Sequence, residues 1–252
     1  MKVELRDGVA LLEMNAGKAN AIGSDWLARM DGLLDEVERS SARALVVTGH
    51  EGFFSAGLDL PTLAPLARDE IVGLMGLFDA FMLRLFETPR PVIAAVNGHA
   101  IAGGCVLALQ ADERIMAAGT AKIGLNEVAL GIGLPAAALE ALRFHVPARS
   151  LVSVALEGRL FSPEEALAAG LVSEVVPPAE LLARALARAQ KLAALGPEGF
   201  ANVKSSLRAP AVAAVRAAWA NGDAEKWTDT WFSPGGQAAI KDAVARLNKP
   251  RK

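Results

Sequence analysis

The stretch Asn97-Gly-His-Ala-Ile-Ala-Gly-Gly-Cys105 decides the fold, because it interrupts an apolar segment in which no Asp, Glu, Lys or Arg occurs from residue 91 to residue 111. That length is about what a helix needs to span a bilayer. Pro91, Asn97-Gly98 and Gly103-Gly104 break the segment, and these residues are typical of turns. The pattern therefore predicts a buried strand, a turn and a helix in place of a membrane span.

The composition excludes several broad classes of protein. The chain has 252 residues, of which 52% are hydrophobic, and this is the opposite of a disordered composition. Its 26 Lys and Arg balance 28 Asp and Glu, so no basic field is available to hold nucleic acid. One Cys and three scattered His fit neither an intramolecular disulfide nor a zinc site. We expect no metal and a reducing compartment.

The N-terminus favours the cytoplasm. It reads MKVELRDGVALLEMN, with acidic residues among alternating polar and apolar ones. A signal peptide has a basic segment followed by an apolar one, and a transit peptide is rich in Arg and poor in acids. Neither pattern is present, so the sequence predicts a cytoplasmic protein.

Strands and helices alternate along the first two thirds of the chain. We expect a hairpin over residues 3–14 with Asp7-Gly8 as its turn, and a helix from an N-cap at Ser24 to residue 39. Further elements are expected at 44–48 (strand), 69–87 (helix), 91–96 (strand), 104–112 (helix) and 114–117 (strand). This order is typical of an α/β fold with a mostly parallel sheet covered by helices.

The last third of the chain is predicted to become helical. Ser162, Pro163 and Glu165 form a capping-box helix start, Gly170 ends that helix, and a strand is expected over 171–176. Beyond Pro178 the pattern predicts only helices, up to Asn248. We divide the chain into a core over residues 1–190 and a C-terminal helical region over residues 191–252.

Several enzyme classes are disfavoured because their local motifs are missing. No GxGxxG follows a strand, there is no GxxxxGK[ST] phosphate loop, and there is no GxSxG nucleophile elbow. The sequence therefore gives no support to dinucleotide, nucleotide or serine-hydrolase chemistry.

Three segments carry the functional argument. They read Phe54-Ser-Ala-Gly-Leu-Asp-Leu60, Asn97-Gly-His-Ala-Ile-Ala-Gly-Gly-Cys105 and Ile123-Gly-Leu-Asn-Glu-Val-Ala-Leu-Gly131. In this order and at these separations they resemble the crotonase (enoyl-CoA hydratase/isomerase) superfamily over essentially the full chain. The first and third are similar to the delta-3,delta-2-enoyl-CoA isomerases in detail. The resemblance implies a spiral of ββα units, followed by helices that assemble trimers or hexamers made of two trimers.

The resemblance also implies an oxyanion hole made by two backbone amides. Gly57 permits a backbone turn that points the Leu58 N–H towards a ligand. By resemblance, the family has one of its two donors at this position. The Gly103 N–H, at a helix N-terminus, would be the other donor. Such a pair stabilises the oxygen of an acyl-CoA thioester as it becomes an enolate.

The carboxylates distinguish the possible reactions. The family's hydratases use two glutamates, and Val106 stands at the first of those positions. The second is retained as Glu127, where apolar neighbours should raise its pKa towards neutrality. One carboxylate that removes a C2 proton and returns it at C4 suits the isomerisation of 3-enoyl-CoA to 2-enoyl-CoA. Two alternatives remain: another crotonase-type reaction, such as hydration or specialised enolate chemistry, and a non-catalytic acyl-CoA-binding or RNA-associated scaffold.

The remaining candidates are residues around the substrate. The segment Lys18-Ala-Asn-Ala-Ile22 matches the family's CoA-contacting loop, one residue shorter than the common hydratase form. Asp59 is expected to cap or brace a loop. His99 could approach the substrate, but a structural hydrogen bond is expected, and Cys105 is expected to be a small core residue. By resemblance, the substrate-binding set is Lys18, Ala19, Asn20, Ala56, Gly57, Asp59, Leu60, Gly104 and Val106.

The expected partners follow from the same resemblance. Acyl-CoA is the substrate, CoA is part of it, and no separate cofactor is required. Trp219, Trp227, Trp231 and Phe232 give the C-terminal helices more aromatic area than a solvated appendage needs. We expect them to serve core packing, assembly into homotrimers or hexamers, and closure of the acyl pocket. Neither nucleic acid nor a membrane is expected as a partner.

Overall fold

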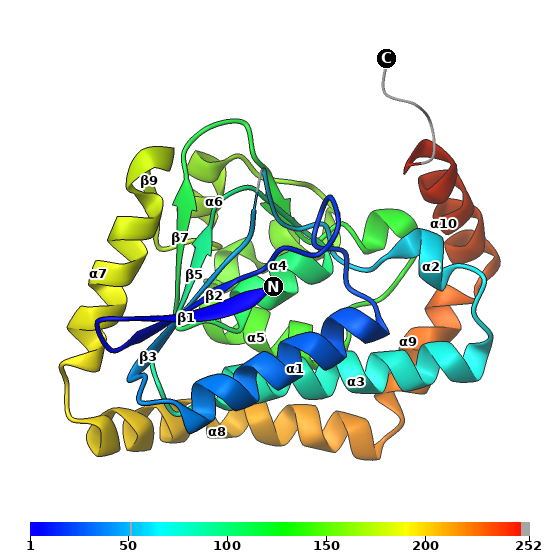
Figure 1. The fold of residues 1–252 in the computed structure, drawn as a ribbon. Helices are drawn as coiled ribbons and strands as arrows, with labels where there is room; N and C mark the ends of the chain where they lie inside the picture. Colours follow the sequence, from blue (N-terminus) through cyan, green and yellow to red (C-terminus); the bar gives the residue numbers. More distant parts are fainter. Residues whose placement is uncertain (51, 248–252) are drawn as a thin grey trace.

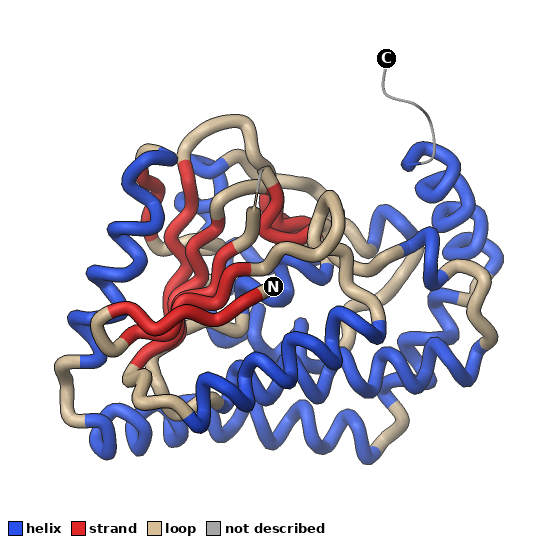
Figure 2. The backbone as a smooth tube through the Cα atoms, in the orientation of Figure 1, coloured by secondary structure: helices blue, strands red, loops and turns tan. Residues whose placement is uncertain are grey.

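Two β-sheets form the centre of the protein. The computed structural model describes residues 1–50 and 52–247 (Figures 1 and 2). The larger sheet has the order β1-β2-β3-β5-β7-β9, and only the β1–β2 pair is antiparallel. Its strands are β1 (Lys2–Arg6), β2 (Val9–Glu13), β3 (Ala44–Thr48), β5 (Val92–Val96), β7 (Glu113–Ala117) and β9 (Glu174–Val176).

The smaller sheet consists of β4 (Phe53–Ser55), β6 (His99–Ile101) and β8 (Ile123–Gly124), all parallel. Along the chain β3 leads into β4, β5 into β6, and β7 into β8. Each of these three repeats of the chain therefore adds one strand to each sheet and then a helical segment. This arrangement confirms the predicted spiral of ββα units.

Helices cover both faces of the larger sheet. One apolar cluster joins β2, β3, β5 and β7 to α7, and a larger cluster fills the space between the opposite face and the other helices. Figure 1 shows α1, α3 and α8 running side by side below the sheet, with α10 beside α2 and α9 against α3. The helices are α1 (Ser24–Arg39), α2 (Leu60–Leu63), α3 (Arg68–Glu87), α4 (Gly103–Leu109), α5 (Ala136–His145), α6 (Pro163–Ala169), α7 (Leu181–Ala193), α8 (Pro197–Ala220), α9 (Asp223–Trp231) and α10 (Pro234–Leu247).

Local signals in the sequence located several elements correctly. The hairpin turn is at Asp7-Gly8, where both residues have positive φ. The capping box is present: the Ser162 N–H donates to Glu165 Oε2 at 2.7 Å, and the Glu165 N–H donates to Ser162 Oγ at 3.2 Å. Gly170 ends that helix at φ +80°. None of the described helices is both long and apolar enough to cross a bilayer.

Other boundaries differ from the prediction. The N-cap of α1 is Gly23, with Ser24 as the first helical residue. Helix α4 covers Gly103–Leu109, where 104–112 was expected. The expected strand 171–176 is shorter in the structure, where only β9 forms, because the N–H groups of Leu171 and Val172 donate hydrogen bonds to Ala166 O in α6. Strands β4, β6 and β8 were not predicted, since two or three residues are too short for an alternating pattern. Asn248 lies outside the described residues.

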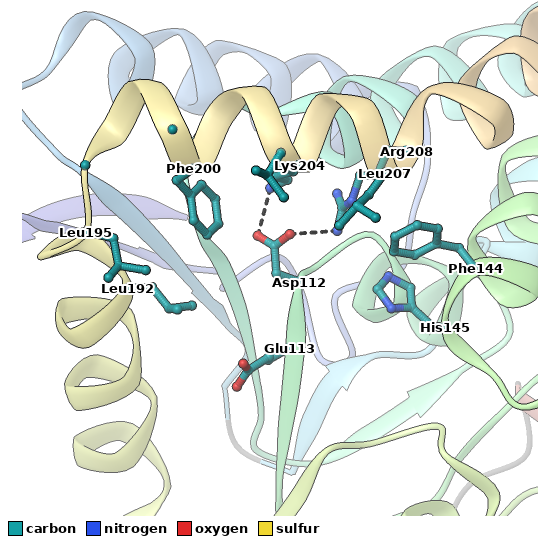
Figure 3. A pocket seen from close by; sticks show the side chains of 13 residues that line it. Asp112, Glu113, Phe144, His145, Leu192, Leu195, Phe200, Lys204, Leu207 and Arg208 are labelled. Atoms are coloured by element: carbon teal, nitrogen blue, oxygen red, sulfur yellow. Dashed lines mark hydrogen bonds and ion pairs between the residues drawn. The ribbon is translucent and has the colours of Figure 1, made fainter.

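A buried ion-pair network fixes α8 to the sheet. Asp112 accepts hydrogen bonds from Lys204 Nζ at 2.7 Å, Arg208 Nη2 at 2.8 Å and the Val92 N–H at 2.7 Å (Figure 3). Both cations are almost fully buried, and burial lowers the pKa of Lys204 to about 8. The network forms part of the wall of a cavity of about 650 Å³ between α7 and α8. None of the predicted site residues lines this cavity, so it is separate from the three motifs.

Replacing the shared carboxylate should destabilise the protein strongly. Asp112→Asn leaves two buried cations without a counter-charge, and we expect a loss of about 3–5 kcal/mol in the free energy of unfolding. Urea denaturation followed by circular dichroism measures it. The control is Glu113→Gln, which breaks a partly exposed pair with Arg188 and should cost about 1 kcal/mol or less. Equal losses in the two variants would contradict this role of Asp112.

Candidate active site

The three motifs predicted from the sequence meet at one edge of the smaller sheet. Its parallel strands end at Ser55, Ile101 and Gly124, and backbone pairing places Ser55 beside Ala100 and Ile101 beside Gly124. Each motif includes residues of one of these strands and continues beyond its carboxyl end. In α/β proteins this edge is where ligands bind.

Glycines allow two of these motifs to approach at backbone distance. Gly57 has φ +83°, and a Cβ atom built on it would lie 2.8 Å from Ile101 O and 2.9 Å from Gly103 N. A Cβ atom on Gly104 would lie 2.1 Å from Ser55 O. No side chain fits at either position. The close approach therefore depends on these two glycines.

The two predicted oxyanion donors are open. Among the described residues, neither the Leu58 N–H nor the Gly103 N–H has a hydrogen-bond acceptor. Gly103 is the first residue of α4, so its N–H has no partner inside the helix. Ala102 before it has φ +52°, a conformation that costs a residue with a side chain about 1–3 kcal/mol. This strained turn directs the chain from β6 into α4.

Glu127 is a buried carboxyl group without an ionic partner. It follows β8 by three residues, and its side chain is 9% exposed. Burial raises its pKa to about 7, while backbone hydrogen bonds from Glu127 itself and Asn126 act in the opposite direction. Its Oε2 atom is buried with no hydrogen-bond partner among the described residues. Such a group can both accept and return a proton near neutral pH.

Three residues near the motifs have structural environments. His99 Nδ1 accepts a hydrogen bond from the Lys122 N–H at 3.0 Å, and its ring packs on Phe53. The Cys105 thiol is fully buried, and burial with the nearby Glu127 carboxylate raises its pKa. Val106 is 1% exposed within α4. These environments confirm the structural hydrogen bond expected of His99 and the core position expected of Cys105.

The predicted CoA loop lies against the first motif. Asn20 is buried at φ +48°, and its amide donates to the backbone oxygens of Met14 and Phe54. The Ala56 N–H donates to Ala19 O at 2.9 Å. The Asn20 side chain therefore braces the loop from within, whereas Lys18 is exposed at its tip.

Other contacts complete this part of the site. Ser55 Oγ donates to Asn20 O at 2.8 Å and accepts from the Gly57 N–H at 3.2 Å. Asp59 Oδ2 accepts from Thr62 Oγ1 at 2.8 Å, as expected for a residue that braces a loop, and Leu60 begins α2. Sequence reasoning missed Ser55, because its role depends on a loop 35 residues away and has no local pattern.

Comparison with known proteins agrees with this geometry. Residues 4–233 match the family described as enoyl-CoA hydratase/isomerase. The chain belongs to this family. One relative is the human mitochondrial enoyl-CoA delta isomerase 1, which is 33% identical over 182 residues, or 71% of this chain and 60% of that protein. Another is the short-chain-enoyl-CoA hydratase of Clostridium acetobutylicum, 36% identical over 77% of this chain and 76% of that protein.

Solved structures of the family have the same fold. The human mitochondrial delta3-delta2-enoyl-CoA isomerase superposes with a TM-score of 0.92 at 28% identity, over 98% of this chain and 97% of that one. An enoyl-CoA hydratase from Mycobacterium ulcerans gives a TM-score of 0.84 at 32% identity, over 89% and 98% of the two chains. Family members with both kinds of name are thus similar to this chain.

The buried carboxyl group should make stability depend on pH. The pKa of Glu127 is about 7 in the folded state against an ordinary 4.5, so the folded state binds more protons between these values. Its contribution to stability is full below pH 4.5 and is lost as the pH rises through 7. The stability of Glu127→Gln relative to the wild type should therefore rise by about 3 kcal/mol across this window.

Urea denaturation at several pH values measures this difference. The matched control is Glu164→Gln, at an exposed position of α6. A stability difference between Glu127→Gln and the wild type that stays constant from pH 4.5 to above pH 7 would contradict the raised pKa.

Proposed function

We propose that the protein is an acyl-CoA isomerase that moves the double bond of a 3-enoyl-CoA to the 2-position. The observation that carries the proposal is the pairing of one buried, unpartnered carboxyl group at Glu127 with two open amides at the same sheet edge. Position 106, where the family's hydratases have a second glutamate, holds a buried Val. A valine can neither accept a proton nor orient water.

The proposed mechanism uses one group as base and then as acid. The Glu127 carboxylate takes the C2 proton, and the electrons of the C2–H bond move into the thioester to give a dienolate. The N–H groups of Leu58 and Gly103 stabilise the negative oxygen. Protonated Glu127 then delivers the proton to C4, the carbonyl re-forms, and the double bond lies between C2 and C3. The proton removed from C2 is the one returned at C4, and the reaction involves no net oxidation or reduction, so it requires no cofactor.

The low-dielectric position of Glu127 serves both steps. A carboxylate of ordinary pKa would be too weak a base to remove a proton from carbon. A much more basic group would remove it but would not release it to C4. A pKa near 7 lies between these limits. In this proposal, apolar surroundings also keep water away from the dienolate.

Hydration of a 2-enoyl-CoA is the second candidate. It is favoured by the names of bacterial relatives that are 34–36% identical to this chain. Incubation with a 3-enoyl-CoA yields conjugated 2-enoyl-CoA if the protein is an isomerase. Incubation with a 2-enoyl-CoA yields 3-hydroxyacyl-CoA if it is a hydratase. Tight CoA binding without turnover of either substrate would indicate a non-catalytic acyl-CoA-binding protein.

Loss of the catalytic carboxylate should abolish isomerisation. Glu127→Gln keeps the size of the side chain and removes the proton acceptor, so we expect kcat/KM to fall by about a thousandfold or more. In the wild type, kcat/KM should rise with pH and level off above the pKa of about 7, because only the carboxylate is a base. Absorbance of the conjugated product measures both effects, with Glu164→Gln as control. Full activity of Glu127→Gln would refute the mechanism.

Closing the space between the two amides should also abolish activity. Gly57→Ala places a methyl group 2.9 Å from Gly103 N, which forces the donors apart. We expect kcat/KM to fall by about a hundredfold to a thousandfold. The control is Gly32→Ala on α1, where an added Cβ would meet no atom within 4 Å. Wild-type turnover by a folded Gly57→Ala variant would argue against an oxyanion hole here.

We further propose that the chain assembles as a homotrimer or as a dimer of trimers. Supporting this, Val152 and Leu156 on a short π-helical segment are 61% and 64% exposed, and Leu207 on α8 is 63% exposed. Burial of these side chains between subunits would remove apolar surface from water, which is favourable. Light scattering during size-exclusion chromatography gives the mass directly, and a monomer would refute the proposal.

A further inference from the structure

The loop that follows Glu127 fixes the position of its backbone. The N–H groups of Leu130 and Ile132 both donate to Glu127 O, at 2.9 and 3.0 Å. The loop then passes through Gly131, at φ +68°, and enters α5 at Ala136. A displacement of this loop therefore moves Glu127 as well.

Little else holds the catalytic side chain. Among the described residues, no side chain donates a hydrogen bond to the Glu127 carboxylate, and its Oε2 has no partner at all. The direction of the carboxylate consequently depends on its backbone and on the apolar packing around it. Whatever holds the loop also determines where the proton acceptor lies.

One face of α9 holds this loop. Asp223, Trp227 and Thr230 are spaced by four and three residues, so they lie on the same side of the helix. The Ala136 N–H donates to Asp223 Oδ2 at 2.9 Å. The Gly133 N–H donates to Thr230 Oγ1 at 2.9 Å, and Trp227 Nε1 donates to Gly133 O at 2.8 Å. Both polar groups of the Gly133 backbone are thus bound by side chains of one helix.

The C-terminal helices also restrict the loop by contact. A Cβ atom on Gly131 would lie 3.3 Å from Gly236 N at the start of α10, so the two backbones nearly touch. Trp227 is 5% exposed, and Thr230 Oγ1 donates back to Trp227 O at 2.6 Å. Asp223, Trp227 and Thr230 therefore form a packed, hydrogen-bonded surface against the loop.

We propose that Trp227 and Thr230 on this face of α9 are positioning residues, which hold Glu127 in line with the reacting carbons through Gly133. The inference rests on the proposed role of Glu127 as the proton carrier. This role acts through the loop and requires no contact between either residue and the substrate. Their hydrogen bonds hold the loop against α9, and the loop in this position keeps the Glu127 carboxylate in its apolar surroundings.

The test compares Thr230→Val with two matched variants. Thr230→Val removes the acceptor for the Gly133 N–H, and Thr230→Ser retains it. Thr228→Val removes a hydroxyl of the same helix that donates to Ala224 O and, among the described residues, makes no hydrogen bond to the loop. We expect Thr230→Val to lower kcat about tenfold with little change in KM, because a small misplacement of a reacting group slows the chemical step. The other two variants should stay close to the wild type, and Trp227→Phe should resemble Thr230→Val.

A second readout follows the pKa of Glu127 without turnover. The pH dependence of the stability difference between a variant and the same variant carrying Glu127→Gln reports this pKa. Cys105 is a titratable group near Glu127, and Asp79, whose pKa burial raises to about 6, lies near Asp223. Subtraction of the paired measurements removes their contributions. A loosened loop admits water, so Thr230→Val should lower the pKa of Glu127 towards its ordinary value.

The outcomes separate this inference from the proposed function. If Thr230→Val lowers only the melting temperature and leaves kcat, its pH profile and the pKa of Glu127 unchanged, the residue is ordinary packing and the inference is refuted. If the wild type does not isomerise 3-enoyl-CoA but Thr230→Val still shifts the pKa of Glu127, the positioning role stands and the proposed reaction falls.

Discussion

The site depends on the contact between two backbones at Gly57 and Gly103. These segments are 46 residues apart in sequence, yet a single added methyl group on Gly57 would lie within 3 Å of both Ile101 O and Gly103 N. Parallel pairing of β4, β6 and β8 brings them together, and the spiral of ββα units places those strands side by side. The larger sheet and its helices provide the support for this close approach.

A second constraint is the burial of Glu127, which opposes stability. The folded protein must keep an unpartnered carboxyl group in apolar surroundings, and this becomes costly once the group ionises. Ala102 adds backbone strain next to the Gly103 amide. Both unfavourable features lie at the site of the proposed reaction. The favourable packing of two apolar clusters compensates for them elsewhere in the molecule.

The sequence predicted the parts of the fold that have local causes. Apolar periodicity located α1, the Asp7-Gly8 turn located the hairpin, and Ser162 with Glu165 located α6. The motif glycines and Glu127 led to the candidate site through their resemblance to the family's motifs. Strand β8, with two residues, has too little pattern to be recognised. The contacts of α9 join residues 94 and 97 positions apart, so no local pattern indicates them.

The separation between Gly133 and its partners also matters while the chain is being made. Trp227 leaves the ribosome 94 residues after Gly133, when every strand of both described sheets has already been synthesised. The sheets and their motif residues can thus assemble before the loop behind Glu127 acquires its final hydrogen bonds. A nascent or truncated chain that ends before α9 would contain every motif residue and still lack the contacts that hold this loop.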